Sequence, residues 1–468
     1  MHDTHKNTGI QQLKDSLPAE SWSEDPELIA PHLHEWRDRW QGHTPLMLTP
    51  HSTAEVVKAV KICSEFGLGI VPQGGNTGLV GGQIPQGEVL LSSKRLNKFR
   101  SISARSMTVE SGCILQHVLA KAESKNTIFP LSLASQGSAT IGGLCSTNAG
   151  GVHVVRYGSM RNLVTGLEVV LADGSVFNSL EPVKKDNTGY NMTSTFIGAE
   201  GTLGVITAAS LQLIPKAKHI ETLLLAITDV KKAIAVLHAC EDNFGQSLSM
   251  IELLPQIALD FVTRHIPRSK NPFAEKHPWY LLIHFEFHHT AGTTTQVENF
   301  IANLIQNKLI VDAIRAESLA QTQALLELRE HISEAQKPEG GSIKHDICVP
   351  LEKIPEFIHK ASIAVTSLEP GCRPVPFGHI GDGNIHFNVS QPPGMDKAIY
   401  LSNTQRMNRV VHDIVSDMGG SISAEHGIGI LKKQELAERA NPIKLATMRK
   451  LKQALDPQNI MNPRVLFL

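Results

Sequence analysis

The run Pro72-Gln73-Gly74-Gly75-Asn76-Thr77-Gly78 begins where an apolar segment, Gly69-Ile70-Val71, ends, and it is the stretch that decides the fold. Upstream, Ser52 and Glu55 form a capping box, and apolar residues at helical spacing predict a helix that continues to Gly67. The pattern therefore predicts a helix, a short strand and a glycine-rich loop. Because ligands usually bind at strand-to-loop turns in α/β folds, we expect a ligand here.

Three more glycine-rich loops follow, and the last of them ends at Gly204. They are Gly137-Ser138-Ala139-Thr140-Ile141-Gly142-Gly143, Thr147-Asn148-Ala149-Gly150-Gly151 and Gly198-Ala199-Glu200-Gly201-Thr202-Leu203-Gly204. Such loops present backbone N–H groups, unobstructed by side chains, to bound phosphates. A single loop of this kind is more often a turn, but four in one region are hard to explain as turns. We therefore expect a bound nucleotide.

The fingerprint of nicotinamide-dinucleotide folds, GxGxxG, is absent from the chain. Three candidates, Gly67-Leu68-Gly69, Gly381-Asp382-Gly383 and Gly427-Ile428-Gly429, all lack the last glycine. The sequence therefore predicts a nucleotide cofactor that is held by other means.

Composition and charge exclude several classes of protein. Of the 468 residues 41% are hydrophobic, and 44 basic residues balance 45 acidic ones, so no basic stripe builds the field that nucleic acid needs. We expect no nucleic-acid partner. No apolar run reaches the roughly 18 residues of a membrane span, and no secretory signal opens the chain, so we expect a soluble cytoplasmic protein without a membrane span.

The six cysteines lie far apart and form no CxxC, which favours buried thiols over disulfides. They are Cys63, Cys113, Cys145, Cys240, Cys348 and Cys372.

Strand and helix patterns mix along the chain, which predicts an α+β protein of two or three domains. We expect an N-terminal segment 1–40, a first domain 41–216, a second domain 217–415 and a C-terminal segment 416–468 that returns to the first domain. The runs predicted as strands are 89–91, 107–110, 163–171, 205–213, 222–227 and 280–287, and those predicted as helices are 114–123, 230–241, 296–307 and 324–336.

Six motifs carry a family resemblance. In the order PQGGNTG, GSATIGG, STNAGG, RYGS, DNTGY and EGTLG, they resemble the FAD-binding domain of the p-cresol methylhydroxylase type over about residues 45–215. The chain thus resembles the FAD-dependent oxidases and dehydrogenases of the vanillyl-alcohol oxidase type. The resemblance implies an α+β fold, in which a two-lobed FAD-binding domain is joined to an α+β substrate-binding cap domain with an antiparallel sheet. Relatives with covalent flavin carry a histidine in the first loop, where this chain has Asn76, so we expect non-covalent FAD.

The resemblance also implies roles in holding FAD. The first loop would wrap the pyrophosphate, the second and third would line the isoalloxazine and ribityl region, and Ile206 would contact the adenine side. Asn462 would close over the flavin from the C-terminus, although the usual Asn-Pro-Gly ending reads Asn462-Pro463-Arg464 here. The residues expected to bind the cofactor are Pro72, Gly74, Gly75, Asn76, Thr77, Gly78, Ser138, Gly142, Gly143, Thr147, Asn148, Gly150, Gly201, Ile206 and Asn462.

A second constellation lies in the C-terminal half. His379 and His386 flank the tight turn Gly381-Asp382-Gly383, and Glu425-His426 follows downstream. Two imidazoles and a carboxylate suit a metal such as zinc or manganese. From spacing alone, however, a histidine is more often a satisfied polar residue, and the chain has 22 histidines.

Over about residues 220–467 this arrangement is similar to the C-terminal half of the D-2-hydroxy acid dehydrogenases. The resemblance implies that His379, His386 and Glu425 bind a divalent metal, zinc before manganese or iron, with one coordination position open. The metal would bind the α-carboxylate and hydroxyl of the substrate and lower the pKa of the hydroxyl. His426 would bind the substrate and act as the catalytic base, while the C2 hydrogen leaves as hydride to the flavin.

A third cluster concerns the acid that is oxidised. In the helical run 324–336, Arg329 and Ser333 stand four residues apart and so would share one face, and Lys344 follows on a strand-like segment. In a generic protein these are solvated charges. Their order and spacing nevertheless resemble the substrate-binding residues of D-2-hydroxyglutarate dehydrogenases, with serine replacing a threonine. Arginine pairs bidentately with carboxylates, so a dicarboxylate is expected, and Asn388, on the same strand face as His386, would hydrogen-bond it.

The leading hypothesis is therefore a D-2-hydroxyglutarate dehydrogenase that produces 2-oxoglutarate and passes electrons to an external acceptor, an electron-transfer flavoprotein or a quinone. One alternative is the same chemistry on D-lactate or glycolate. Another is a flavin-binding subunit of a larger complex without catalysis of its own, against which the intact histidine and glutamate set argues. A homodimer is an expectation from the family alone.

Overall fold

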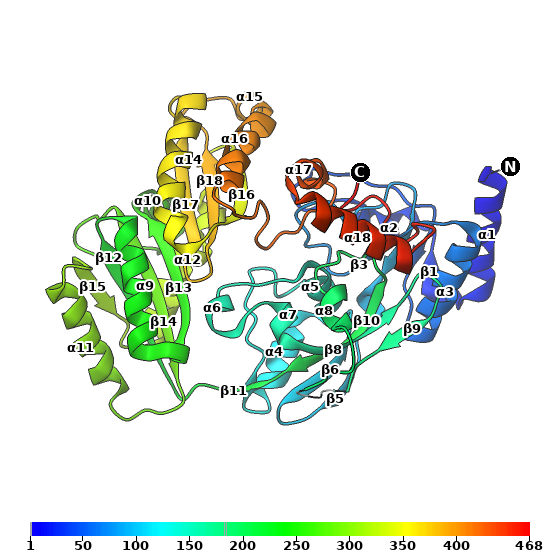
Figure 1. Ribbon diagram of the computed structural model, residues 1–468, viewed down its shortest axis with the longest axis horizontal. Coiled ribbons are helices and arrows are strands. Elements are labelled where there is room, and N and C mark those ends of the chain that lie inside the picture. Colours follow the sequence, from blue (N-terminus) through cyan, green and yellow to red (C-terminus); the bar gives the residue numbers. More distant parts are fainter. Residues whose placement is uncertain (1, 182, 184) are drawn as a thin grey trace. The chain divides into compact units, whose positions relative to one another are not determined.

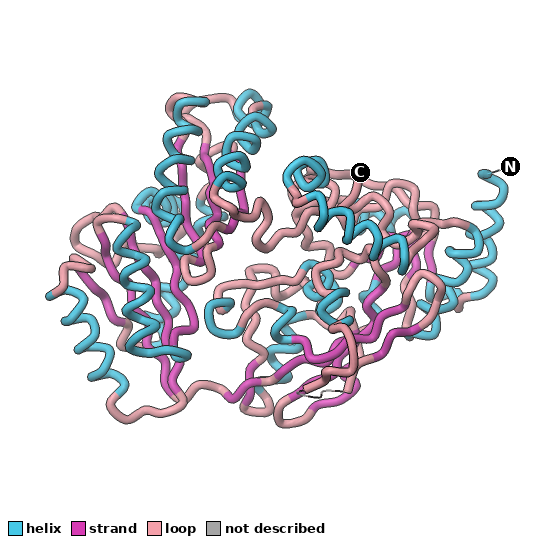
Figure 2. Tube along the Cα trace, viewed as in Figure 1, coloured by secondary structure: helices cyan, strands magenta, loops and turns pink. Residues whose placement is uncertain are grey.

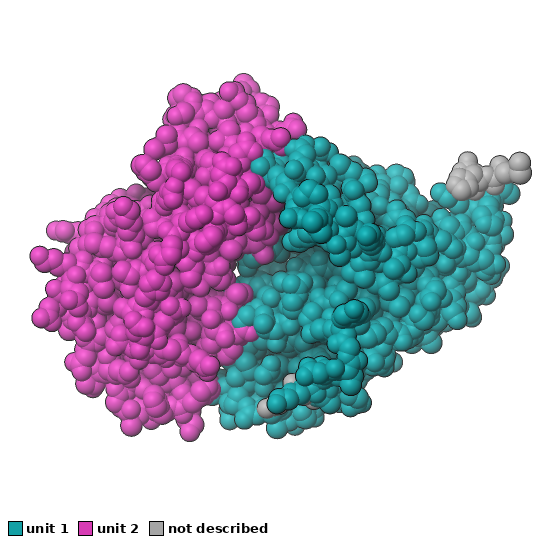
Figure 3. Space-filling model, viewed as in Figure 1, with its two compact units in different colours: residues 1–151, 158–216, 425–468 teal, residues 152–157, 217–424 magenta. Residues whose placement is uncertain are grey.

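The computed structural model describes residues 2–181, 183 and 185–468. Met1, Pro182 and Lys184 lie outside the described residues, so the expected N-terminal segment 1–40 is seen from His2 onward. The chain forms two compact units (Figure 3). Unit 1 comprises residues 1–151, 158–216 and 425–468, and unit 2 comprises residues 152–157 and 217–424.

Unit 1 is built on two main sheets (Figure 1). A four-stranded sheet has the order β1-β2-β4-β3, and a five-stranded antiparallel sheet has the order β5-β6-β10-β8-β9. The small sheet begins as the sequence predicts, because Ser52 caps helix α3 (Thr53–Phe66) and Gly67, at φ 62°, ends it in the left-handed region. The buried face of α3, including Val56 and Val60, belongs to the core of unit 1. Strand β3 (Ile70–Gln73) follows directly and leads into the first glycine loop.

The helices of unit 1 are α1 (His2–Ser16), α2 (Pro26–Leu33), α3, α4 (Leu115–Glu123), α5 (Ile141–Thr147), α7 (Met160–Leu163), α8 (Met192–Phe196), α17 (Lys433–Arg439) and α18 (Pro442–Leu455). Its strands are β1 (Trp22–Ser23), β2 (Met47–Leu48), β3, β4 (Val89–Ser92), β5 (Phe99–Ile102), β6 (Ser106–Glu110), β7 (Thr127–Ile128), β8 (Val164–Val170), β9 (Val176–Asn178), β10 (Val205–Gln212) and β11 (Ile214–Pro215).

Unit 2 is a seven-stranded antiparallel sheet with helices on both faces (Figure 2). The strand order is β15-β12-β14-β13-β17-β18-β16. On one face, apolar residues of α9, α11, α14 and α16 form a core with alternate residues of the strands, such as Ile283 and Phe387. On the other face, α10, α12 and α13 pack on the intervening residues, such as Leu282 and Phe377. The second face also carries the polar residues of the proposed site.

The helices of unit 2 are α6 (Val154–Tyr157), α9 (Val230–Phe244), α10 (Gln256–His265), α11 (Thr293–Gln306), α12 (Leu319–Glu330), α13 (Ile332–Ala335), α14 (Ile354–Leu368), α15 (Lys397–Ser402) and α16 (Thr404–Asp417). Its strands are β12 (His219–Ile227), β13 (Leu248–Pro255), β14 (Trp279–Phe287), β15 (Asp312–Arg315), β16 (Ser342–Cys348), β17 (Arg373–His379) and β18 (Asn384–Ser390).

The structure differs from the expected domain boundaries in two places. Unit 2 extends to Ala424 rather than 415, because Cys348 and Ser421 exchange backbone hydrogen bonds of 2.9 and 2.7 Å. This pairing continues β16 and keeps the chain on the sheet beyond α16. Unit 2 also includes the short segment 152–157, in which His153 Nδ1 lies 3.2 Å from Ser249 O and Arg156 bonds Glu286.

The six cysteines form no disulfide, as predicted, and all are buried except the partly buried Cys348. Within the described part of the chain, no helix combines the length and the apolar character needed to cross a bilayer.

Candidate functional site

The first two glycine loops of unit 1 pack closely against each other. A Cβ atom on Gly74 would lie 2.2 Å from Thr140 Oγ1, and one on Gly75 would lie 1.9 Å from the backbone oxygen of Ser138. Gly142 on α5 is equally close to Ser111, since a Cβ there would lie 2.6 Å from its side chain. Only glycine allows these approaches, so the loop after β3 and the start of α5 form one continuous glycine-lined surface.

The C-terminal tail joins this surface through Asn462. Its Nδ2 donates to Gly82 O at 3.0 Å and to Glu200 O at 2.8 Å. Glu200 also accepts, through its carboxylate, the N–H groups of Ile428 at 2.8 Å and Gly429 at 2.7 Å. Burial raises the pKa of Glu200, and these two N–H donors only partly offset the effect. Glu200 therefore ties the fourth glycine loop to the segment that follows His426.

Two predicted cofactor residues use their side chains to shape the loops. Asn76, in the left-handed region at φ 55°, donates to His34 O at 2.8 Å. Asn148, at φ 52°, accepts from Ser159 Oγ at 2.9 Å and from Arg161 N at 3.0 Å. In these positions they hold the backbone of their loops in place.

The loops suit a nucleotide cofactor. Among the described residues, Thr140 Oγ1 and Asn462 Oδ1 are buried without a hydrogen-bond partner, and both belong to the glycine-lined region. Buried polar atoms are normally paired, so these two unpaired oxygens, beside glycines that leave no room for side chains, fit a polar ligand. Ile206, on β10, is buried within the sheet.

In unit 2 five predicted site residues share one face of the sheet. Strand register places His379 opposite Glu252, His386 opposite both Phe377 and Asp346, and Asn388 opposite Lys344. The rings of His379 and His386 lie 5.3 Å apart between centroids. Arg329 reaches the same face from α12, with its guanidinium 5.0 Å from the centre of the Phe377 ring.

Glu252 links two of these residues. Its Oε1 lies 2.5 Å from His379 Nδ1, and its Oε2 accepts a hydrogen bond from Arg329 Nε. Burial alone would raise the pKa of Glu252, but the charges of His379 and Arg329 outweigh it and lower the pKa to about 2. The carboxylate is therefore ionised and forms a buried triad with one histidine and one arginine.

The neighbouring polar residues are also connected. His386 Nδ1 lies 4.0 Å from Asp346 Oδ1, and Asn384 Nδ2 donates to the same carboxylate oxygen at 3.0 Å. Asn388 Nδ2 donates to Gln336 Oε1 at 2.7 Å, so this predicted substrate ligand is already oriented by the end of α13.

The predicted helix 324–336 is wrong as a single element. It is divided at His331 into α12 and α13, so Arg329 and Ser333 lie on different helices. The apolar residues on both sides of His331, namely Leu325, Leu328, Ile332 and Ala335, all bury against the same face of the sheet. Ser333 is exposed, whereas Arg329 is largely buried.

Glu425 and His426 belong to unit 1 by the division of the chain. Glu425 Oε1 accepts the N–H of Gly151 at 2.9 Å. The residue before Glu425 is the last of unit 2, and this Ala424 donates through its N–H to Asp346 O at 3.4 Å. This hydrogen bond holds Ala424 beside β16, the strand that carries Asp346.

Three residues of these networks, Glu252, Asp346 and Glu200, escaped the sequence analysis. Both Glu252 and Asp346 are buried, and Glu252 interrupts a strand that is otherwise mostly apolar. A lone carboxylate in such a strand has to find a charged or hydrogen-bonding partner, which is the signal that could have identified Glu252. Glu200 lies inside a quoted motif, but only the structure reveals its partners.

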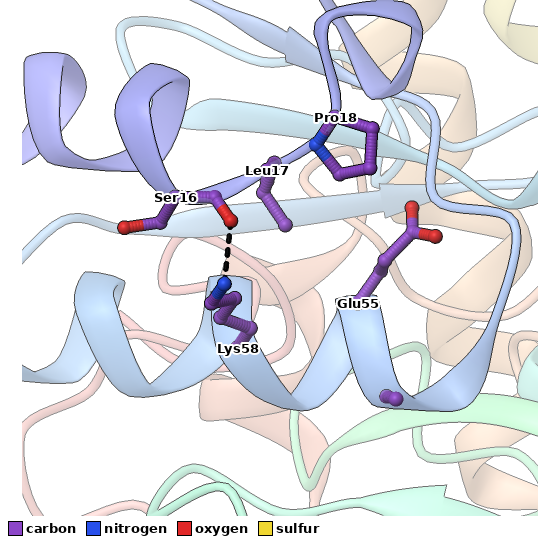
Figure 4. Close-up of a pocket in the computed structure, with 6 residues that line it drawn as sticks. Ser16, Leu17, Pro18, Glu55 and Lys58 are labelled. Atoms are coloured by element: carbon purple, nitrogen blue, oxygen red, sulfur yellow. Dashed lines mark hydrogen bonds between the residues drawn. The ribbon is translucent and has the colours of Figure 1, made fainter.

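A hollow of about 460 Å³ lies elsewhere, between α1 and α3 in unit 1 (Figure 4). Its lining includes Leu17, Pro18 and Glu55, and Lys58 Nζ donates to Ser16 O at 2.6 Å beside it. It contains none of the predicted site residues.

Comparisons with known families agree with the division of the sequence. The pattern described as the C-terminal domain of FAD linked oxidases matches residues 216–466, and the pattern described as an FAD binding domain matches residues 44–179. The two matches support FAD as the cofactor that the family resemblance implies.

Two curated relatives match over nearly the whole chain. The mitochondrial D-2-hydroxyglutarate dehydrogenase of Arabidopsis thaliana is 34% identical over 457 residues, which cover 97% of this chain and 80% of the relative. The D-2-hydroxyglutarate dehydrogenase of Xanthomonas citri pv. viticola is 33% identical over 464 residues, which cover 98% of this chain and 96% of the relative.

Among solved structures, p-cresol methylhydroxylase with bound substrate matches with a TM-score of 0.75 at 16% identity, covering 98% of this chain and 96% of that one. The fold likeness confirms the predicted fold class.

Proposed function

The chain belongs to the family of FAD-linked oxidases, which are FAD-dependent oxidoreductases, and from this premise we propose that it oxidises D-2-hydroxyglutarate to 2-oxoglutarate. The observation that carries the proposal is the polar face of the unit 2 sheet. It gathers two cations, Arg329 and Lys344, with the imidazoles of His379 and His386 and the amide of Asn388. The relatives named D-2-hydroxyglutarate dehydrogenase support the same substrate.

FAD, when bound, accepts the two electrons and the hydrogen removed from C2 of the substrate. The loops of unit 1 would hold it, and the loop that contains Gly74 and Gly75 would bind the pyrophosphate. Because Asn76 stands where relatives with covalent flavin carry a histidine, the flavin would be bound non-covalently.

We propose that His379, His386 and Glu425 hold a divalent metal, zinc in the first instance. The residues fit such an ion, because an imidazole whose Nδ1–H donates to a carboxylate carries its lone pair on Nε2, and Glu252 provides that carboxylate for His379. The metal, when bound, supplies a Lewis acid that polarises the hydroxyl of the substrate. His426, next to Glu425, takes the hydroxyl proton.

Arg329, Lys344 and Ser333 would bind the distal carboxylate, and Asn388 would donate to the bound acid through its amide. The guanidinium is preorganised for this role, since Phe377 lies beneath it and Glu252 holds its Nε. Electrons then leave the reduced flavin for an external carrier, an electron-transfer flavoprotein or a quinone.

One observation favours a second candidate, a D-lactate or glycolate dehydrogenase. Arg329 already forms an ion pair with Glu252, which neutralises part of the positive charge that a distal carboxylate needs. On this alternative Arg329 is a structural residue, and the substrate is a monocarboxylate.

The first test is anaerobic reduction of the bound flavin. The visible spectrum of the purified protein is recorded, and D-2-hydroxyglutarate, L-2-hydroxyglutarate and D-lactate are added separately. We expect the D-dicarboxylate to bleach the flavin band at concentrations where the other two leave it unchanged. Bleaching by D-lactate at lower concentration would establish the second candidate, and no bleaching by any of the three would contradict both.

A further inference from the structure

We propose that Glu252 is a positioning residue that couples the clamp for the distal carboxylate to the metal site, by holding Arg329 and His379 in one hydrogen-bonded triad. The inference rests on the proposed function and deepens it. It makes metal affinity and the preference for a dicarboxylate depend on one side chain that contacts neither ligand.

The first step is geometric. Glu252 is fully buried on β13, in the row of the sheet that pairs with His379 on β17. Its two carboxylate oxygens have different partners, since Oε1 lies 2.5 Å from His379 Nδ1 and Oε2 accepts from Arg329 Nε. A rotation of the carboxylate that favours one partner therefore disturbs the other.

The second step concerns the donors of Arg329. A guanidinium has five N–H donors, and the bond to Glu252 engages the one on Nε. The four donors on Nη1 and Nη2 form the forked end that pairs with carboxylates. The ring of Phe377 lies 5.0 Å from the guanidinium carbon and restricts the plane of the group. Glu252 and Phe377 together fix the direction of the fork.

The third step concerns His379. A hydrogen bond from Nδ1 to a carboxylate sets the tautomer of a metal-binding histidine, and losing such a partner typically weakens metal binding about 10- to 100-fold. Glu252 is the carboxylate in that position. Since the same side chain orients Arg329, its loss should weaken metal binding and substrate selection together.

Glu252→Gln is the variant that tests this coupling. Glutamine keeps the size of the side chain and one acceptor oxygen, but it presents an NH₂ group to either His379 or Arg329, which are both donors. The matched control is Glu339→Gln. Glu339 also bridges an arginine and a histidine of unit 2, with Arg373 Nη1 at 2.5 Å and His265 Nε2 at 2.6 Å, and it lies outside the proposed site.

Three properties are measured on the FAD-loaded proteins: zinc affinity by competition with a chelator, and KM and kcat for D-2-hydroxyglutarate and for D-lactate. For Glu252→Gln we expect zinc affinity to fall about 10- to 100-fold. The KM for D-2-hydroxyglutarate should rise about tenfold or more, while the KM for D-lactate, which has no distal carboxylate, should change much less. Glu339→Gln should resemble the wild type in all three. If Glu252→Gln does not fold, Glu252→Asp, which keeps the charge but shortens the reach, should show the same two losses in smaller measure.

The outcomes separate the inference from the function. If the wild type binds zinc and prefers the dicarboxylate, and Glu252→Gln matches Glu339→Gln in every measurement, the role of Glu252 is overturned and the proposed function stands. If the wild type itself neither binds zinc nor prefers the dicarboxylate, the proposed function fails and the inference fails with it.

Discussion

Two carboxylates show how single residues support the two halves of the proposed site. Glu252 is bonded by His379 and Arg329, and although burial opposes the effect, these partners lower its pKa to about 2. Glu200 accepts from two backbone N–H groups and has the charge of Lys432 nearby, yet burial raises its pKa despite them. The balance between burial and the partners thus decides the direction of the shift.

At the same scale, Glu425 and His426 should fail in different ways. Glu425→Ala removes a metal ligand, so we expect the protein to keep FAD, to lose bound metal and to lose nearly all turnover. His426→Ala removes the proposed base and a substrate contact but no metal ligand, so we expect metal content to stay and turnover to fall about 100-fold or more. Metal analysis, the flavin spectrum and kcat distinguish them. Near-normal metal content and turnover in Glu425→Ala would contradict its assignment as a ligand.

His284 should make unit 2 sensitive to acid. Burial, and then the neighbouring His153, lower its pKa from 6.5 to about 4, with Glu286 acting in the opposite direction, and Thr222 Oγ1 lies 2.9 Å from its Nδ1. The unfolded chain therefore binds a proton near pH 6.5 that the folded chain refuses until about pH 4, so the stability that neutral His284 contributes is lost as the pH falls between these values.

We expect His284→Gln to lose about 2 kcal/mol less of its free energy of unfolding than the wild type between pH 7 and pH 5. Urea denaturation at the two pH values measures this difference. The exposed His359, replaced in the same way, serves as the control and should behave as the wild type does. Equal losses in His284→Gln and the wild type would mean that His284 titrates normally in the folded protein.

At the scale of elements, close packing of the glycine loops should control cofactor binding. A Cβ on Gly75 would lie 1.9 Å from Ser138 O, so Gly75→Ala forces the loop after β3 away from the loop before α5. We expect FAD to bind about 100-fold more weakly, as measured by flavin fluorescence on titration. Gly137→Ala is the control, because its Cβ would lie 3.4 Å from the flexible side chain of Gln116 and no closer to another group. Equal FAD affinities in the two variants would show that loop packing does not control binding.

The break between α12 and α13 belongs to the same scale. The run 324–336 has a sequence suited to one helix, but the structure divides it at His331, and both halves place apolar residues on the same face of the sheet. Gln336, just past α13, accepts a hydrogen bond from Asn388 on β18. Gln336 therefore helps to position a proposed substrate ligand.

At the scale of the whole molecule, every predicted FAD residue lies in unit 1 and none in unit 2. A ligand that binds only the folded state at 100 times its Kd adds about 2.7 kcal/mol of stability. For a unit of this size we expect FAD to raise the unfolding temperature of unit 1 by about 5–10 °C. Differential scanning calorimetry of apo and FAD-loaded protein measures it, and Gly75→Ala should respond less at equal FAD. An unchanged unfolding temperature in the wild type would argue against FAD binding to unit 1.

The sequence by itself determined the features that depend on neighbouring residues. The capped helix α3, strand β3 and the glycine loop after it form as the local pattern predicts, because caps, periodicity and glycine act over a few residues. Only the tertiary structure decided the partners of buried charges. Glu252 is 77 residues from Arg329 and 127 from His379, and no local pattern specifies contacts over such distances. They arise because strand order in the sheet of unit 2 brings β13 beside β17, where a buried carboxylate has to be paired.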